Sequence, residues 1–190
     1  MIVEHRNVVS LVRDTNYTTI TAGDKILQLS NYGFDGSVFD IFGSVLNGAC
    51  IYMIDKTRLL SGTRLIDFIA THEVNIMFIT TALLNNFIDI GPAFLKHFDK
   101  IYFGGENASI PRIRAALPFR KTSESLVHVY GPTEATTFST YYVIKDEIPH
   151  NWPSIPIGVP LTHRQVYVLD TNRCLCPVGV SGELYIGGSG

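Results

Sequence analysis

Leu126-Val127-His128-Val129-Tyr130-Gly131-Pro132-Thr133-Glu134 is the stretch that decides the fold of this chain. Its first five residues predict a buried strand, and Gly131-Pro132 ends that strand. The turn then places a hydroxyl and a carboxylate beside an aromatic ring. Such a ring can stack on a base, a Thr can bind phosphate oxygens, and a Glu can hold Mg²⁺. A turn with Thr133 as a helix N-cap and Glu134 in the first helical turn is the alternative.

Four further apolar runs precede this strand and alternate with segments of helical length. The expected strands cover residues 25–29, 49–54, 74–79 and 100–103, and the expected helices lie near 36–48, 61–72, 81–89 and 109–117. Apolar strands that alternate with helices are typical of a mostly parallel sheet buried on both faces. We therefore predict an α/β fold in which helices flank such a sheet.

The pattern changes after about residue 141. Four prolines at 149, 153, 156 and 160 punctuate this region, which holds short β-like pieces at 165–170 and 182–187 with no helical pattern between them. We predict two parts, an α/β core over residues 1–145 and the start of a small β subdomain over residues 146–190.

Short polar or glycine-containing segments follow the expected strands. They are Phe34-Asp35-Gly36, Phe78-Ile79-Thr80, Gly104-Gly105-Glu106 and Tyr130-Gly131-Pro132. Ligands of parallel sheets bind beyond the carboxyl ends of the strands, so one crevice is expected to gather these segments. Asp35 lies among phenylalanines and is costly to bury unless it caps the following helix or pairs with a cation, and both interpretations stay open.

Composition excludes several classes of function. The 190 residues are 46% hydrophobic and 17% charged with a net charge of −2, which argues against disorder and against a nucleic-acid partner. No apolar run reaches the ~18 residues that span a bilayer, and no signal-peptide pattern opens the chain, so no membrane partner and a cytoplasmic location are expected. The three cysteines lack zinc-site spacing and are interpreted as reduced and structural.

Four motifs together resemble a known family. They are residues 4–12, 34–42, 129–134 and 182–188, in the order that the family has them. The ordered set is similar to the adenylation domains of nonribosomal peptide synthetases, within the adenylate-forming superfamily that also holds acyl-CoA synthetases and luciferases.

The resemblance implies a reaction. An amino acid carboxylate attacks the α-phosphate of ATP with Mg²⁺, which forms an aminoacyl adenylate and pyrophosphate, and the phosphopantetheine thiol of a carrier protein then takes the aminoacyl group. Carrier protein and condensation domains of the same assembly line are the implied partners. Thr133 and Glu134 are the implied catalytic residues, with Glu134 holding the metal. The implied nucleotide-binding residues are Gly104, Gly105, His128, Tyr130, Gly131 and Thr133.

By the same resemblance, Asp35 pairs with the α-ammonium group of an amino acid substrate. The implied substrate pocket is aromatic and aliphatic and consists of Asp35, Gly36, Phe39, Phe78, Tyr102, Gly104, Val129, Thr137 and Phe138. This lining predicts a hydrophobic amino acid, with Ile or Val favoured. One methylene changes such discrimination by only ~1–3 kcal/mol.

The resemblance also implies missing parts. Residues 4–13 predict a helix without an N-cap and Gly190 falls in a glycine-rich turn, so an excerpt of a longer protein is expected. A phosphate loop, a ribose-binding Asp, a hinge and a catalytic Lys lie outside this sequence in the family pattern, and residues 1–190 alone are expected to be inactive. An acyl- or aryl-CoA ligase, which Asp35 disfavours, and a noncatalytic nucleotide-binding module are the alternatives.

Overall fold

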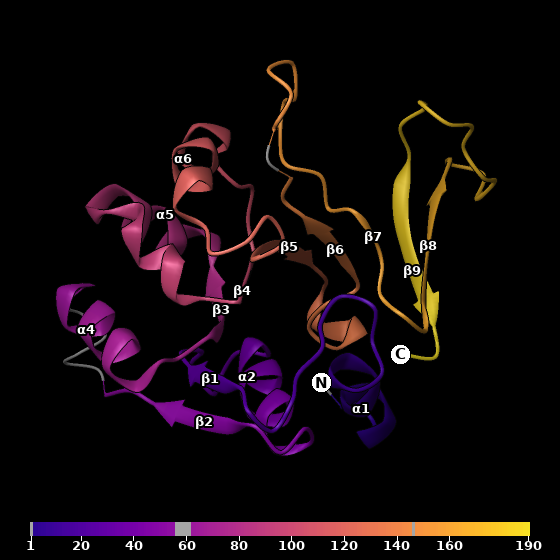
Figure 1. Cartoon of the computed structure of the whole chain (residues 1–190). Coiled ribbons are helices and arrows are strands. Elements are labelled where there is room, and N and C mark those ends of the chain that lie inside the picture. The colour runs from indigo at the N-terminus through magenta and orange to yellow at the C-terminus, as the bar shows by residue number, and fades with distance from the viewer. Residues whose placement is uncertain (1, 56–61, 146) are drawn as a thin grey trace.

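The computed structural model describes residues 2–55, 62–145 and 147–190 (Figure 1). The strands are β1 (Lys25–Gln28), β2 (Cys50–Met53), β3 (Ile76–Thr80), β4 (Lys100–Gly104), β5 (Leu126–Tyr130), β6 (Thr140–Val143), β7 (Val159–Pro160), β8 (Arg164–Leu169) and β9 (Glu183–Gly188). The α-helices are α1 (His5–Val12), α2 (Gly36–Val45), α4 (Gly62–His72), α5 (Thr81–Ile90) and α6 (Ile110–Ala116). Single 3-10 segments are η1 (Pro92–His97), η2 (Leu117–Phe119) and η3 (Thr133–Ala135). In these described ranges, no helix is long and apolar enough to cross a membrane.

A seven-stranded sheet with the order β2-β1-β3-β4-β5-β6-β7 organises the chain. Its first five strands pair in parallel, whereas β6 and β7 are antiparallel. The chain moves outward from β1 to β2 and then returns past β1 to form β3. This reversal makes the gap between the carboxyl ends of β1 and β3 the topological switch point of the sheet. The predicted α/β class with a mostly parallel sheet is confirmed.

The two faces of the sheet carry different helices, as Figure 1 shows. Met77 and Ile79 of β3 pack in a cluster with residues of α4, α5 and α6. Ile76 and Phe78 point the other way, into a cluster that includes residues of α1 and α2. The alternation follows from the period of two along a strand. It places Phe78 on the same face as α2, whose first turn follows Asp35.

Most predicted elements are present, with two differences at helix ends. The helix expected near 36–48 ends at Val45, because the next turn closes it with a bond from the Ala49 N–H to the Ser44 carbonyl at 3.0 Å. The expectation that the first helix lacks a cap is wrong. The Asn7 side chain accepts a hydrogen bond from the Glu4 backbone N–H at 2.9 Å, which satisfies one free donor at the helix start.

The chain after β5 does not leave the main sheet at once. Strand β6, which the sequence analysis did not predict, pairs with β5, and β7 then pairs with β6. The separate β8–β9 hairpin begins at Arg164 and is the yellow hairpin beside β7 in Figure 1. The division into parts at residues 145 and 146 stays a prediction.

Asp40 joins helix α2 to the end of β1. Its side chain is fully buried, and its Oδ2 accepts backbone N–H bonds from Leu29 at 3.2 Å and Ser30 at 2.9 Å. Burial raises the pKa of the Asp40 carboxyl to about 7, against the opposing effect of the hydrogen bonds from Ser30 and Leu29. The buried carboxyl therefore fixes the start of the segment that leads from β1 to Asp35.

The raised pKa of Asp40 predicts that the hydrogen bonds from the Leu29 and Ser30 amides to its carboxyl depend on pH. A carboxyl whose folded pKa lies above its unfolded value stabilises the fold when protonated, and this contribution is lost as the pH rises from about 4 to about 7. The slope is about 1.4 kcal/mol per pH unit within that window. We expect hydrogen exchange at the Leu29 and Ser30 amides, corrected for its intrinsic pH dependence, to lose protection across this window. In Asp40→Asn, which cannot ionise, this loss is expected to vanish, and an equal loss in both proteins would contradict the assignment.

Candidate functional site

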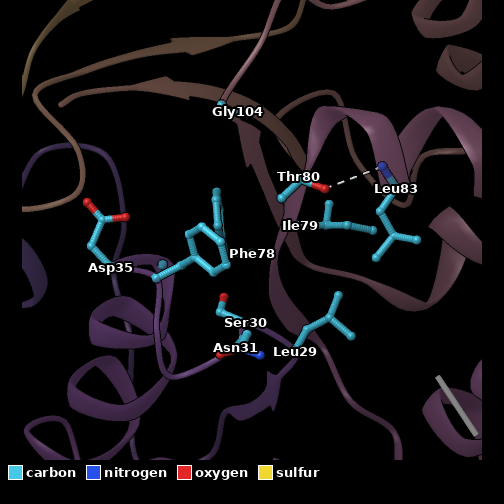
Figure 2. Close-up of a pocket in the computed structure, with 12 residues that line it drawn as sticks. Leu29, Ser30, Asn31, Asp35, Phe78, Ile79, Thr80, Leu83 and Gly104 are labelled. Atoms are coloured by element: carbon cyan, nitrogen blue, oxygen red, sulfur yellow. Dashed lines mark hydrogen bonds between the residues drawn. The ribbon is translucent and has the colours of Figure 1, made fainter. Parts of the chain in front are cut away.

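A cavity of about 380 Å³ opens at the switch point between β1 and β3 (Figure 2). Its walls come from the ends of β1, β3 and β4 and from the start of α2. The lining residues are Leu29, Ser30, Asn31, Phe34, Asp35, Gly36, Phe78, Ile79, Thr80, Leu83, Gly104 and Gly105. The structure therefore brings together the segments that were expected to meet after β1, β3 and β4.

A second, smaller cavity of about 80 Å³ adjoins the first. Both are lined by Asp35, Phe78, Gly104 and Gly105, so these four residues form the shared wall. The smaller cavity adds Val129, Gly131, Thr137 and Phe138 from β5 and the loop that follows it. Seven of the nine residues predicted for the substrate pocket line one or both cavities.

Asp35 supplies the carboxylate of this site. It occupies the N-cap position of α2, as the helix-cap interpretation expected, but its side chain makes no capping hydrogen bond, so the carboxylate itself does not cap the helix. In Figure 2 its carboxylate points away from the body of α2 and lies opposite the ring of Phe78. A half-buried carboxylate beside an apolar wall interacts more strongly with a cation than it would in bulk water. The arrangement can therefore pair with an ammonium group.

The loop between β5 and β6 carries unusual backbone geometry. Thr136 and Thr137 have φ values of 56° and 67°, a left-handed conformation that is rare for β-branched residues and costs ~1–3 kcal/mol each. Gly131 permits the loop to fold back, because a Cβ there would lie 2.7 Å from the Ser139 nitrogen and from the Thr137 carbonyl oxygen. The Thr137 hydroxyl donates to the Asp35 carbonyl at 3.0 Å. This bond joins the loop to the start of α2.

Apart from His128, the residues predicted to bind nucleotide lie along the carboxyl edge of β4 and β5. Tyr130 ends β5 with 40% of its surface exposed, and Thr133 and Glu134 are exposed on η3. The N-cap of η3 is Pro132, so the alternative in which Thr133 caps a helix is wrong. Gly105 has a φ of 96°, and a Cβ there would meet nothing within 4 Å, so this turn leaves room for a flat ring.

His128 lies on the opposite face of the sheet from Val129. Its ring is buried and stacks on Phe103, with centroids 5.0 Å apart. Its Nδ1 lies 2.9 Å from the Pro156 carbonyl oxygen, which can only accept, so Nδ1 carries a proton. Burial lowers the pKa of His128, although the bond to Pro156 opposes this shift, and the ring is neutral at pH 7. The Pro156 bond is a structural contact that the sequence did not indicate.

Two of the predicted pocket residues lie behind the cavities. Phe39 and Tyr102 are fully buried, line neither cavity, and contact each other with ring centroids 5.0 Å apart. Phe39 also contacts Phe138 at 5.7 Å. Burial raises the pKa of Tyr102, so its phenol stays protonated. These rings support the walls of the small cavity.

Seven residues of the larger cavity were not predicted from the sequence as site residues. The missed residues are Leu29, Ser30, Asn31, Phe34, Ile79, Thr80 and Leu83, of which Phe34, Ile79 and Thr80 had been expected only at strand ends. Thr80 could have been identified from the sequence as a helix N-cap, a position that Thr favours. It is the N-cap of α5, and its hydroxyl accepts a hydrogen bond from the Leu83 N–H at 3.4 Å. Thr81 is buried and donates to the carbonyls of Gly104 and Glu106 at 3.2 Å, which fixes the glycine turn.

The donor set for a metal is limited. Within the described part of the chain, no group of three or more His, Cys, Asp or Glu side chains could hold a metal ion. Mg²⁺ is usually bound through one or two carboxylates together with phosphate oxygens of a substrate. The exposed Glu134 carboxylate at the edge of the sheet could supply one such carboxylate ligand.

A doubly wound α/β sheet with an apolar cavity and glycine turns at its switch point defines a class of proteins that bind nucleotides and small molecules. The family model described as "AMP-binding enzyme" matches residues 1–190. The chain therefore belongs to the family of AMP-binding enzymes.

Individual relatives are much longer than this chain. The chain is 48% identical over 190 residues to bacitracin synthase 1 of Bacillus licheniformis and 44% identical over 189 residues to surfactin synthase subunit 1 of Bacillus subtilis (strain 168). These matches cover all of this chain but only 4% and 5% of those proteins. The solved structure of holo-PA1221, described as an NRPS protein containing adenylation and PCP domains, matches with a TM-score of 0.88 at 28% identity. That match covers 97% of this chain and 32% of the other.

The bond between Thr137 and Asp35 can be tested with an isosteric change. Thr137→Val removes the hydroxyl, which is worth about 0.5–1.5 kcal/mol in a typical hydrogen bond, and we expect it to loosen the loop at Asp35. Thr140→Val is the matched control, because the buried Thr140 hydroxyl has no hydrogen-bond partner in the described structure. Thermal unfolding of the protein should show a lower Tm for Thr137→Val only. An equal change in both variants would contradict a specific role for this bond.

Proposed function

We propose that these residues belong to the adenylation domain of a longer parent protein, which activates a hydrophobic α-amino acid as an aminoacyl adenylate with ATP as the second substrate. One observation carries the proposal, namely that Asp35 shares the wall of both cavities with Phe78 and Gly104 at the switch point. Membership of the AMP-binding enzymes and the similarity to peptide synthetases support it.

Asp35 is proposed to bind the α-ammonium group of the amino acid. The support is its free carboxylate, which makes no capping bond, next to a wall that is almost entirely apolar. An acid that lacks an amine would leave this carboxylate without a partner, and a desolvated charge without a partner costs several kcal/mol. Asp35 therefore favours amino acids over acyl or aryl acids.

Ile or Val is the proposed side chain. The small cavity of about 80 Å³ is bounded by Phe78, Val129 and Phe138, and its lining has no charge apart from Asp35. Gly36, Phe39, Tyr102, Gly104 and Thr137 complete the proposed pocket, with Phe39 and Tyr102 acting from behind the wall. A small, apolar space fits a branched aliphatic group better than a ring or a charged chain.

The nucleotide is proposed to lie along the edge from Gly104 to Thr133. The open turn at Gly105 and the half-exposed ring of Tyr130 suit a flat base, with Gly131 and His128 nearby. Thr133 is proposed to bind phosphate and Glu134 to hold Mg²⁺, and together these are the proposed catalytic residues. Bound Mg²⁺ would neutralise phosphate charge as the amino acid carboxylate approaches.

Further proposals concern the whole protein. We propose that the parent transfers the aminoacyl group to the phosphopantetheine of a carrier protein and cooperates with condensation domains. We also propose that it is located in the cytoplasm. The support is the similarity to holo-PA1221, whose description names adenylation and PCP domains, and to bacitracin and surfactin synthases. The division into an α/β core over 1–145 and a β subdomain from 146 is likewise proposed.

The proposed function is tested by comparing two substrates, with and without an amine, in the wild type and in an Asp35 variant. ATP–pyrophosphate exchange is measured in the parent's adenylation domain with valine and with 3-methylbutanoate, which is valine without its amine. The wild type should prefer valine strongly. Asp35→Ala should remove about 2–5 kcal/mol of valine recognition, which is roughly 30-fold or more in kcat/KM, and leave the KM for ATP nearly unchanged.

The control is Asp67→Ala, which removes an exposed carboxylate from α4. It should behave as the wild type with both substrates. Equal use of valine and 3-methylbutanoate by the wild type would favour an acyl acid ligase. The absence of exchange with any carboxylic acid would favour a noncatalytic module, and both results contradict the proposal.

A further inference from the structure

Tyr17 is buried between α1 and β1, outside any helix or strand, with only 4% of its surface exposed. Its ring contacts Tyr102 at 5.5 Å, Phe138 at 6.1 Å and Phe39 at 6.5 Å between centroids. These separations lie in the range in which aromatic pairs attract each other. Tyr17 therefore contacts three of the rings proposed to shape the substrate pocket, although it lines neither cavity.

The hydroxyl of Tyr17 fixes the ring in place. It donates to the carbonyl oxygen of Leu11 in α1 at 2.8 Å. Burial raises the pKa of Tyr17 well above its usual value, so the phenol keeps the proton that it donates. The ring cannot move away without breaking this bond, and α1 thus acts as the support behind it.

The rings form successive layers behind the small cavity. Phe78 and Phe138 line the cavity and contact each other at 5.1 Å. Phe39 and Tyr102 are fully buried, and Phe39 lies directly against Phe138 at 5.7 Å. Tyr17 completes this aromatic cluster, since its ring contacts Phe138 and the two buried rings of Phe39 and Tyr102.

We propose that Tyr17 is a positioning residue that determines specificity. It limits how far the rings of Phe138 and Phe39 can move away from the small cavity, and it thereby sets the depth of that cavity. The inference rests on the proposed function. Protein interiors are close-packed, so a ring with filled space behind it holds its place when a ligand presses on it. Loss of the Tyr17 ring would open space into which Phe138 and Phe39 can move, and a larger substrate side chain would then fit.

Three variants of the parent's adenylation domain test this inference by exchange kinetics. The readout is the ratio of kcat/KM for phenylalanine to kcat/KM for valine. Tyr17→Leu should raise this ratio by about tenfold or more. Tyr17→Phe keeps the ring and loses only the bond to Leu11, so its ratio should stay within about twofold of the wild type. Tyr52→Leu is the matched control, since Tyr52 packs against Phe68 and His72 on the other side of the sheet.

A purely structural role for Tyr17 would lower kcat/KM for both amino acids together and leave the ratio unchanged, which would overturn the inference. If Tyr17→Leu does not fold, Tyr17→Met partly refills the space with a flexible chain and should shift the ratio in the same direction by a smaller factor. An unchanged ratio in the folded Met variant would overturn the inference equally. Absence of exchange by the wild type would overturn the proposed function together with this inference, whereas a normal wild type with unchanged variant ratios overturns this inference alone.

Discussion

The reversal of strand order between β1 and β3 is the constraint on which the site depends. Crossover connections between parallel strands are right-handed, so a chain that reverses its direction along the sheet must place successive helices on opposite faces. Helix α2 accordingly packs on one face and α4 on the other. The carboxyl ends of β1 and β3 are left without a helix between them, and the larger cavity opens there.

The start of α2 meets this crevice, and two acids five residues apart, Asp35 and Asp40, have different roles there. Asp40 is fully buried and holds the backbone of Leu29 and Ser30, so it fixes the cavity wall. Asp35 keeps its carboxylate free and is held instead through its carbonyl by Thr137. One acid thus provides structure, and the other remains available to a ligand.

Much of the fold could be predicted from local pattern. Runs such as 25–29 and 100–103 are mostly apolar without strict alternation, which is typical of strands buried on both faces, and both became strands of the parallel sheet. The meeting of Asp35, Phe78 and Gly104 followed from the rule that ligand sites lie beyond the carboxyl ends of such strands. The family resemblance then singled out the pocket residues, and the chain does belong to the AMP-binding enzymes.

Other features depend on contacts that a sequence pattern does not contain. Thr136 and Thr137 adopt left-handed conformations that β-branched residues avoid. Thr137 is held by its tertiary bond to the Asp35 carbonyl and by the close approach of Gly131. Tyr17 lies in no motif and no regular element, so nothing local indicated its contact with Phe39, Tyr102 and Phe138.

A crystal structure of the parent's adenylation domain with valyl-sulfamoyl-adenosine, a stable mimic of the aminoacyl adenylate, would show directly whether Asp35 binds the amino group of the substrate. We expect the ligand's ammonium group to hydrogen-bond to the Asp35 carboxylate and its isopropyl group to occupy the small cavity, in contact with Phe78 and Phe138. The adenine should lie beside the turn at Gly105. A ligand bound away from this edge of the sheet, or bound with its amine facing away from Asp35, would contradict the account.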